Sequence, residues 1–259
     1  MAGIVTELPY HVVTVGGIGE QHTPEPSGML RHVTEHLNPL RFFSEQFNWQ
    51  NTYGPVPVWN GAAYADNMAT AAARLAAHIS SLIGQNRRVV PMGYSGGAHV
   101  LSTALTMLER DGVTRSDIPA AVMLSNPVRS PHDPTIVTGH AGRYGVAGVH
   151  GAFPRGMTLV DLANPVDVIC SCPPPPYPVR GFADLSQHFS LADPVRWGVE
   201  LLAAVKAGRL QNGWKLSSLP AWFDAVALVR GYLYDGQHTS WYIPRAIQAA
   251  DVLKSALGE

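Results

Sequence analysis

The sequence predicts an α/β domain in which a mostly parallel central sheet is flanked by helices. Short apolar and β-branched runs alternate with longer segments whose apolar residues recur every three or four positions. The 25 glycines and 21 prolines are spread along the whole chain, which is typical of many tight turns rather than of one disordered tail. With 259 residues, of which 46% are hydrophobic, one sizeable core is available, and we expect a single domain over residues 1–259.

The N-terminal half is predicted to alternate strand and helix. His11–Val15 is a β-branched run that enters the glycine-rich loop Gly16–Gly19. The elements expected after it are a helix over 29–37 that stops before Pro39, a strand over 47–49, and a long helix whose apolar face runs from Met68 to Leu82 and which ends at Gly84.

The C-terminal half continues the pattern and then adds helices. The expected elements are a strand over 88–92, a helix from Ala98 that ends at Gly112, strands over 119–124 and 157–162, and helices over 193–208, 220–229 and 244–257. A long loop is expected over residues 127–154. We expect residues 173–231, which begin with four prolines, to form a helical insertion near the end of the domain.

Composition excludes several classes of protein. Net charge is −1 and only 14% of residues are charged, so no basic surface is available for nucleic acid. The longest apolar stretch, residues 62–83, is interrupted by Asp66, Arg74 and His78, which excludes a transmembrane helix. The N-terminus lacks a basic segment followed by an apolar run, so we expect no secretory signal.

The motif Gly93-Tyr94-Ser95-Gly96-Gly97 is the strongest chemical signal. It follows a predicted strand and opens a predicted helix, as a nucleophile elbow requires. Small flanking residues let strand and helix approach each other, so that the serine oxygen stands clear at the carboxyl edge of the sheet. A glycine-rich turn with a capping serine is the simpler interpretation; we expect Ser95 to be a nucleophile.

A serine hydroxyl needs a base and an acid, which in elbow hydrolases follow it in the order acid, histidine. Of the 11 histidines, His238 lies in a loop just before the last predicted helix, where this fold delivers its base. Asp167 lies just past the strand over 157–162 and is the expected acid, with Asp161 and Asp184 as alternatives.

An oxyanion hole requires backbone N–H groups that point at the developing negative charge. We expect one donor from Gly96, the residue after the nucleophile, and a second from Gly17 or Ile18 in the loop after the first strand. A dinucleotide-binding loop is excluded there because His22 stands where the third glycine of G-x-G-x-x-G would be.

Four segments in this order resemble the cutinase-like serine esterases of the α/β-hydrolase fold: VTVGGIGE, GYSGGA, LANPVDVI and GQHTSWY. Within that group the chain most resembles the lysin B enzymes of mycobacteriophages, which carry a helical subdomain between acid and histidine. The resemblance implies hydrolysis of lipid esters, in particular the ester that joins mycolic acids to arabinogalactan. It also implies an enzyme made in the host cytoplasm and released to the cell wall at lysis, or carried on a virion.

The sequence leaves three alternatives open. The chain could be a cutinase-like phage tail enzyme or bacterial lipase, an acyltransferase, or a catalytically silent virion or binding protein. Aromatic residues of the insertion, including Trp197 and Trp222, could line an acyl channel or belong to the core, and Tyr94 could line the substrate pocket or simply pack. No cofactor is implied, and Cys170 and Cys172, two thiols without further ligands, are expected to be buried and inert rather than to bind metal.

Overall fold

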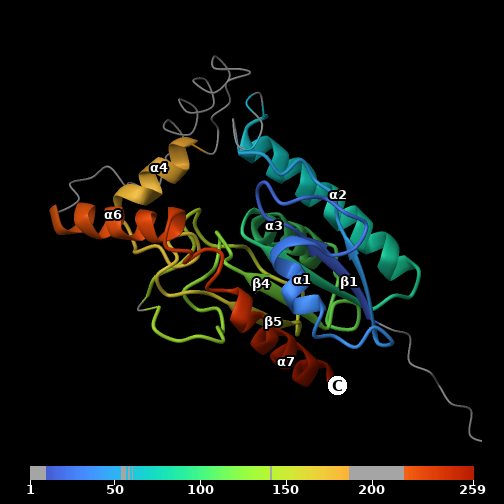
Figure 1. Cartoon of the computed structure of the whole chain (residues 1–259). Helices are drawn as coiled ribbons and strands as arrows, with labels where there is room; N and C mark the ends of the chain where they lie inside the picture. Colours follow the sequence, from blue (N-terminus) through green and yellow to red (C-terminus); the bar gives the residue numbers. More distant parts are fainter. Residues whose placement is uncertain (1–9, 54–56, 58, 60, 141, 187–218) are drawn as a thin grey trace, which may run out of the picture.

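In the computed structural model, helices cover both faces of a central β-sheet (Figure 1). The structure describes residues 10–53, 57, 59, 61–140, 142–186 and 219–259. The elements are β1 (Tyr10–Val15), α1 (Gly28–Thr34), β2 (Phe42–Gln46), α2 (Tyr64–Gly84), β3 (Val89–Tyr94), α3 (Gly96–Arg110), β4 (Ala120–Leu124), β5 (Thr158–Leu162), α4 (Pro178–Ser186), α6 (Leu219–Leu233), the 3₁₀ turn η1 (Ile243–Arg245) and α7 (Ala246–Leu257).

The five strands lie in the order β2-β1-β3-β4-β5 and every neighbouring pair is parallel. The predicted α/β class with a mostly parallel sheet is therefore confirmed. Because all strands run in the same direction, the loops after β1, β3, β4 and β5 all lie at the carboxyl ends of the strands. Open α/β sheets hold their ligands at these ends, and the loops there carry the polar residues described below.

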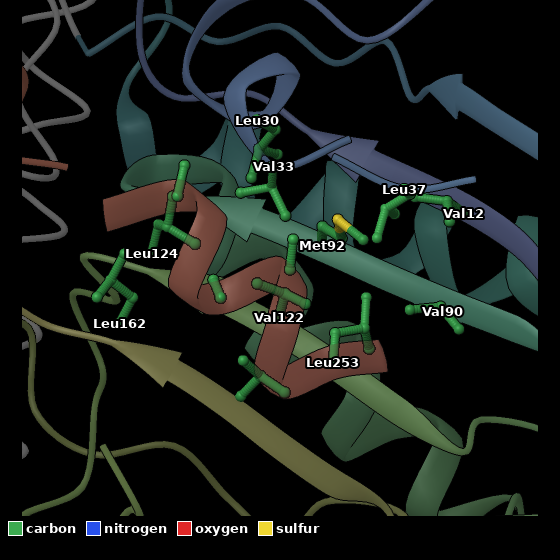
Figure 2. Close-up of a cluster of buried hydrophobic side chains, with 14 of the residues drawn as sticks. Val12, Leu30, Val33, Leu37, Val90, Met92, Val122, Leu124, Leu162 and Leu253 are labelled. Carbon is green, nitrogen blue, oxygen red and sulfur yellow. The ribbon is translucent and has the colours of Figure 1, made fainter. Parts of the chain in front are cut away.

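Alternate residues of each strand pack against opposite helical layers. Val12, Val90 and Val122 belong to the cluster covered by α1 and α7, which Figure 2 shows in close-up. Their neighbours Val13 and Val89 belong to the second cluster, under α2 and α3. Both faces are buried, which is why the central strands are almost uninterrupted apolar runs and could be recognised in the sequence.

The second strand is the element that the sequence analysis placed wrongly. It runs over Phe42–Gln46, not over 47–49. Among the described strands it pairs with β1 alone, at the edge of the sheet. Most of its residues are at least partly exposed, so it carries Glu45 and Gln46 and lacks an apolar run. Trp49, which suggested the strand, is buried in the α2–α3 layer instead, and its indole N–H donates to the carbonyl of Gly16.

The predicted long loop after β4 contains no helix or strand among its described residues, and buried arginines hold it together. The Arg129 guanidinium donates to the carbonyls of Cys170 at 2.8 Å and Arg143 at 2.6 Å. Arg180, at the start of α4, donates to the carbonyls of Gly145 and Cys172 and lies over the ring of Tyr144. Two buried cations thus bind the carbonyl groups of this loop and of residues 170–172, which holds the chain that follows Asp167 in place.

The proposed helical insertion is described only in part. The helices α4 and α6 lie largely within residues 173–231, and the single-domain organisation and the bounds of the insertion stay predictions. The helix expected over 193–208 lies outside the described residues. Within the described part of the chain, no helix combines the length and the hydropathy needed to cross a bilayer.

Candidate active site

Ser95 stands at a sharp turn between β3 and α3. Its φ of 53° and ψ of −121° are strained for a residue with a side chain, as expected for a nucleophile elbow. The turn depends on its glycines: a methyl group at Gly97 would overlap the carbonyl oxygens of Val15 and Gly16, and one at Gly93 would lie 2.6 Å from the Cα of Ala98. The glycines at both ends of the G-x-S-x-G motif are therefore required by close contact between strand, helix and the loop after β1.

The structure brings Ser95, His238 and Asp167 into one hydrogen-bonded chain. His238 Nε2 lies 2.8 Å from Ser95 Oγ, and His238 Nδ1 lies 2.9 Å from Asp167 Oδ2. The three side chains come from the ends of β3 and β5 and from the loop before η1, although 143 residues separate Ser95 from His238. Neither Asp161 nor Asp184, the alternative acids, hydrogen-bonds to His238 within the described residues. This geometry is what a Ser-His-Asp triad requires.

Asp167 is fully buried and its carboxylate is surrounded by donors. Besides His238, its Oδ2 accepts hydrogen bonds from Ser125 Oγ at 2.5 Å and from Tyr242 Oη at 2.8 Å, and its Oδ1 accepts the Ile169 N–H. Burial raises the pKa of Asp167, but the charge and hydrogen bond of His238 and the hydrogen bonds of Ser125 and Ile169 lower it below its usual value. The acid is therefore held ionised beside the imidazole.

Two aromatic rings, those of Tyr94 and Tyr232, pack against the imidazole of His238. Tyr94, the residue before Ser95, stacks on the imidazole with ring centroids 5.3 Å apart, and its hydroxyl donates to the backbone carbonyl of His238 at 2.5 Å. Tyr232 of α6 also packs against the imidazole, with ring centroids 4.8 Å apart. His99, four residues after Ser95, is kept away from the triad: it is buried, pairs with the Tyr64 hydroxyl, and has its pKa lowered to about 4 by burial.

Of the expected oxyanion donors, Gly96 and Ile18 fit and Gly17 does not. The Gly17 N–H already donates to Glu20 Oε2 at 2.7 Å, which corrects the expectation that it could serve. Neither the Ile18 nor the Gly96 N–H has a hydrogen-bond partner in the part of the chain that the structure describes. The two residues are adjacent, since a Cβ at Gly96 would lie 3.0 Å from the Ile18 side chain.

The three residues expected to bind substrate differ in where the structure places them. Tyr94 is buried and its hydroxyl donates to the His238 carbonyl, so its place is to pack against His238. Trp222 on α6 has 49% of its surface exposed and makes no contact with the triad within the described residues, whereas Trp197 lies outside them. Cys170 and Cys172 are buried free thiols. No three His, Cys, Asp or Glu side chains of the described residues are arranged to hold a metal ion.

The sequence analysis missed the residues that support the triad. Ser125 follows β4 directly and has a φ of 50°, the same left-handed strain as Ser95. A polar residue just past the carboxyl end of a buried strand was the available signal for it. Tyr242 is in the segment GQHTSWY, but only packing shows that its hydroxyl reaches back to Asp167. For Glu20, the sequence offered no indication of a supporting role beyond its position next to the glycine-rich loop.

Comparisons with known proteins find solved structures of the same fold. No family model matches the chain, and no curated protein matches it. Among solved structures, an acetylxylan esterase has a TM-score of 0.50 at 18% identity, over 78% of this chain and 99% of its own. A cutinase-like protein from Cryptococcus sp. (TM-score 0.48, 18% identity, 79% of this chain and 96% of its own) and Trichoderma reesei cutinase with a phosphonate inhibitor (0.41, 15%, 74% and 76%) are also similar.

The parallel sheet, the strained serine between β3 and α3, and the likeness to the acetylxylan esterase agree on one architecture. The chain has a cutinase-like α/β-hydrolase fold.

Proposed function

We propose that the protein is a serine esterase in which Ser95 is the nucleophile, His238 the base and Asp167 the acid. One observation supports this most directly: the imidazole of His238 is hydrogen-bonded at Nε2 to a strained serine and at Nδ1 to a buried carboxylate. A capping serine would not need that partner. A structural histidine would not need both. The arrangement is therefore best explained by proton transfer to and from Ser95.

Acylation follows from these contacts. Nε2 of His238 takes the hydroxyl proton as Ser95 Oγ attacks the ester carbonyl, and the carbonyl oxygen becomes an oxyanion held by the N–H groups of Ile18 and Gly96. Asp167 stabilises the imidazolium without taking its proton, because three other donors already occupy its oxygens. The imidazolium then gives the proton to the leaving alkoxide, and an alcohol departs from the acyl-enzyme.

Deacylation repeats the sequence with water. His238 removes a proton from the water that attacks the acyl carbonyl, a second oxyanion forms in the same place, and Oγ of Ser95 leaves with the proton that His238 returns. The acid is released and the resting state is restored. An alcohol in place of water would give ester exchange, so the acyltransferase alternative differs only in the acceptor.

We propose lipid esters as the substrate class, and the mycolic acid–arabinogalactan ester as the natural member. The support is the resemblance of the four sequence segments to lysin B enzymes and the presence of α4 and α6 between Asp167 and His238. An enzyme of this kind would act on the mycobacterial wall, after release at lysis or from a virion.

The first experiment measures hydrolysis of p-nitrophenyl esters from butyrate to palmitate by wild type and by Ser95→Ala. We expect activity in the wild type only, with a fluorophosphonate labelling Ser95 alone. A folded wild type that neither hydrolyses any ester nor reacts with the probe would contradict the esterase proposal and favour the binding-protein alternative.

The second experiment tests the substrate. Purified mycobacterial wall is incubated with each protein, and free mycolic acids are measured by mass spectrometry, with and without an added alcohol. Release of acid by wild type but not by Ser95→Ala supports the proposal. Hydrolysis of p-nitrophenyl esters without any release from the wall would restrict the enzyme to other lipid esters, and ester products with alcohol would favour the acyltransferase.

A further inference from the structure

The carboxylate of Glu20 hydrogen-bonds both to the loop that follows β1 and to helix α1. Its Oε2 accepts the Gly17 N–H and its Oε1 accepts the Met29 N–H of α1, each at 2.7 Å. Hydrogen bonds from N–H groups to a charged carboxylate are among the stronger ones in proteins. Glu20 therefore ties the loop over residues 16–20 to the first turn of the helix that packs beside it.

The chain leaves space for this carboxylate by omitting side chains. A Cβ at Gly28, whose φ is +60°, would overlap the Glu20 carboxylate, and a Cβ at Gly16 would lie 2.9 Å from Oε2. Both neighbours must be glycine if Glu20 is to keep this place. Two sterically required glycines around one half-buried carboxylate indicate that the side chain has a defined position rather than a solvated one.

A second segment holds the same loop from the other side. Asn51 Nδ2 donates to the carbonyls of Gly17 and Glu20, at 2.9 and 2.8 Å, and the Asn51 carbonyl accepts the Gly19 N–H. The Trp49 indole donates to the Gly16 carbonyl at 3.0 Å. The N–H groups of Gly17, Gly19 and Glu20 are thus paired, while the Ile18 N–H has no partner among the described residues.

We infer that Glu20 is a positioning residue for the oxyanion hole, an inference that rests on the proposed esterase function. By engaging the Gly17 N–H, Glu20 fixes the orientation of the next peptide, so that the Ile18 N–H is held beside that of Gly96. An oxyanion donor must be in place before charge develops, since displacement by about 1 Å can cost roughly a hundredfold in rate. Glu20 supplies that preorganisation.

Charge and hydrogen bonding make opposite predictions for Glu20→Gln, which makes this variant decisive. A nearby negative charge repels the oxyanion, so a purely electrostatic effect of the neutral variant would be faster catalysis. Glutamine has one acceptor oxygen and one amide group, so either Gly17 or Met29 would face a donor. If Glu20 positions the loop, the variant is slower.

The experiment compares Glu20→Gln with Glu45→Gln. Glu45 is also a half-buried glutamate with two hydrogen bonds, from His11 and His78, but it lies on the edge strand β2. We expect Glu20→Gln to lower kcat at least about tenfold with KM nearly unchanged, and to raise the inhibition constant of an alkylboronic acid by a similar factor. Glu45→Gln should keep kcat and inhibition within about twofold.

Each result is decisive when wild type is active on p-nitrophenyl esters, because that activity establishes the proposed function separately. Unchanged or increased kcat in folded Glu20→Gln would overturn the inference. If the variant does not fold, wild type is titrated with the boronic acid and its amide resonances are followed by NMR. The Ile18 and Gly96 amide protons should shift downfield and that of Gly17 should change little; a Gly17 shift as large as that of Ile18 would overturn the inference.

Discussion

Two aspartates near the end of β5 have the same burial and opposite environments. Asp161 is within the strand and Asp167 lies just past it, with exposed fractions of 1% and 0%. Asp161 is in register with Met123 of β4 and therefore faces the apolar layer under α2 and α3. Neither of its carboxylate oxygens has a hydrogen-bond partner among the described residues. Burial raises the pKa of Asp161 to about 8, despite the nearby charge of Arg129.

Asp167 shows what is needed to keep a buried carboxylate ionised. The donors Ser125, Tyr242, His238 and Ile169 surround it, and its pKa is lowered even though burial acts in the opposite direction. The comparison teaches that burial does not set the charge of a buried carboxyl group; the donors around its oxygens do. The raised pKa of Asp161 favours its neutral form and the lowered pKa of Asp167 favours its charged form, so Asp167 is the one of the two suited to stabilise an imidazolium.

The largest expected effect separates the two residues by activity. Asp167→Asn removes the negative charge and presents a donor to Nδ1, which favours the wrong tautomer of His238, so kcat should fall roughly 10³- to 10⁴-fold. Asp161→Asn should keep kcat within about twofold, because its carboxyl group has no contact with the triad. Both are measured on p-nitrophenyl butyrate. An equal loss in the two variants would show that the comparison describes packing and not catalysis.

The contrast also shows how much could be predicted from the sequence. That Ser95, Asp167 and His238 lie together could be predicted because a motif, a chain order and the carboxyl ends of parallel strands restrict where each must lie. The strands β3 and β4 could be recognised because both of their faces are buried, whereas β2 was misplaced because an edge strand lacks that signal.

The supporting residues could not be predicted because their partners are distant in the chain. Ser125 lies 42 residues from Asp167 and Tyr242 lies 75 residues from it, and neither pair has a spacing that a helix or a turn would impose. The same holds for Asn51 beneath the loop after β1, since 34 residues separate it from Gly17. Such contacts are set by how loops pack on a finished sheet.

The next expected effect concerns stability and pH. The folded pKa of Asp161, about 8, lies above the unfolded value of about 3.9, so its contribution is most favourable below pH 4 and is lost as pH rises toward 8. Asparagine cannot ionise, so Asp161→Asn should be more stable than wild type by on the order of 5 kcal/mol near pH 7.5 and equal to it near pH 4.

The measurement is the free energy of unfolding in urea across this pH range. The control is Asp251→Asn, since Asp251 on α7 is exposed and, in the part of the chain that the structure describes, pairs with Lys254 alone. Its difference from wild type should stay within about 0.5 kcal/mol at every pH. An Asp161→Asn difference that does not grow with pH would mean that Asp161 is ionised in the folded protein, and the contrast with Asp167 would fail.

A smaller effect is expected when one donor is removed from Asp167. Tyr242→Phe deletes the hydroxyl that donates to Asp167 at 2.8 Å and accepts the Asn164 N–H, and Tyr177→Phe, the control, deletes a hydroxyl on a buried tyrosine that donates to Asp224 at 2.9 Å. Each should lose about 1 kcal/mol of unfolding free energy. Only Tyr242→Phe should lower kcat, by about tenfold, because only its partner faces His238. Equal kcat in the two variants would contradict a role in positioning.

The smallest expected effect is at Cys170, whose Sγ lies 3.8 Å from Asp167 Oδ2. Burial and, after it, the nearby charge of Asp167 together raise the pKa of Cys170 to about 12, so almost no thiolate exists near pH 8. Iodoacetamide should therefore leave esterase activity unchanged until the protein is unfolded, after which both cysteines should react. Inactivation of the native protein, with the label found on Cys170, would show that solvent reaches this region. Asp167 would then be accessible to solvent rather than enclosed by its donors, and the difference between the pKa values of Asp167 and Asp161 would require another explanation.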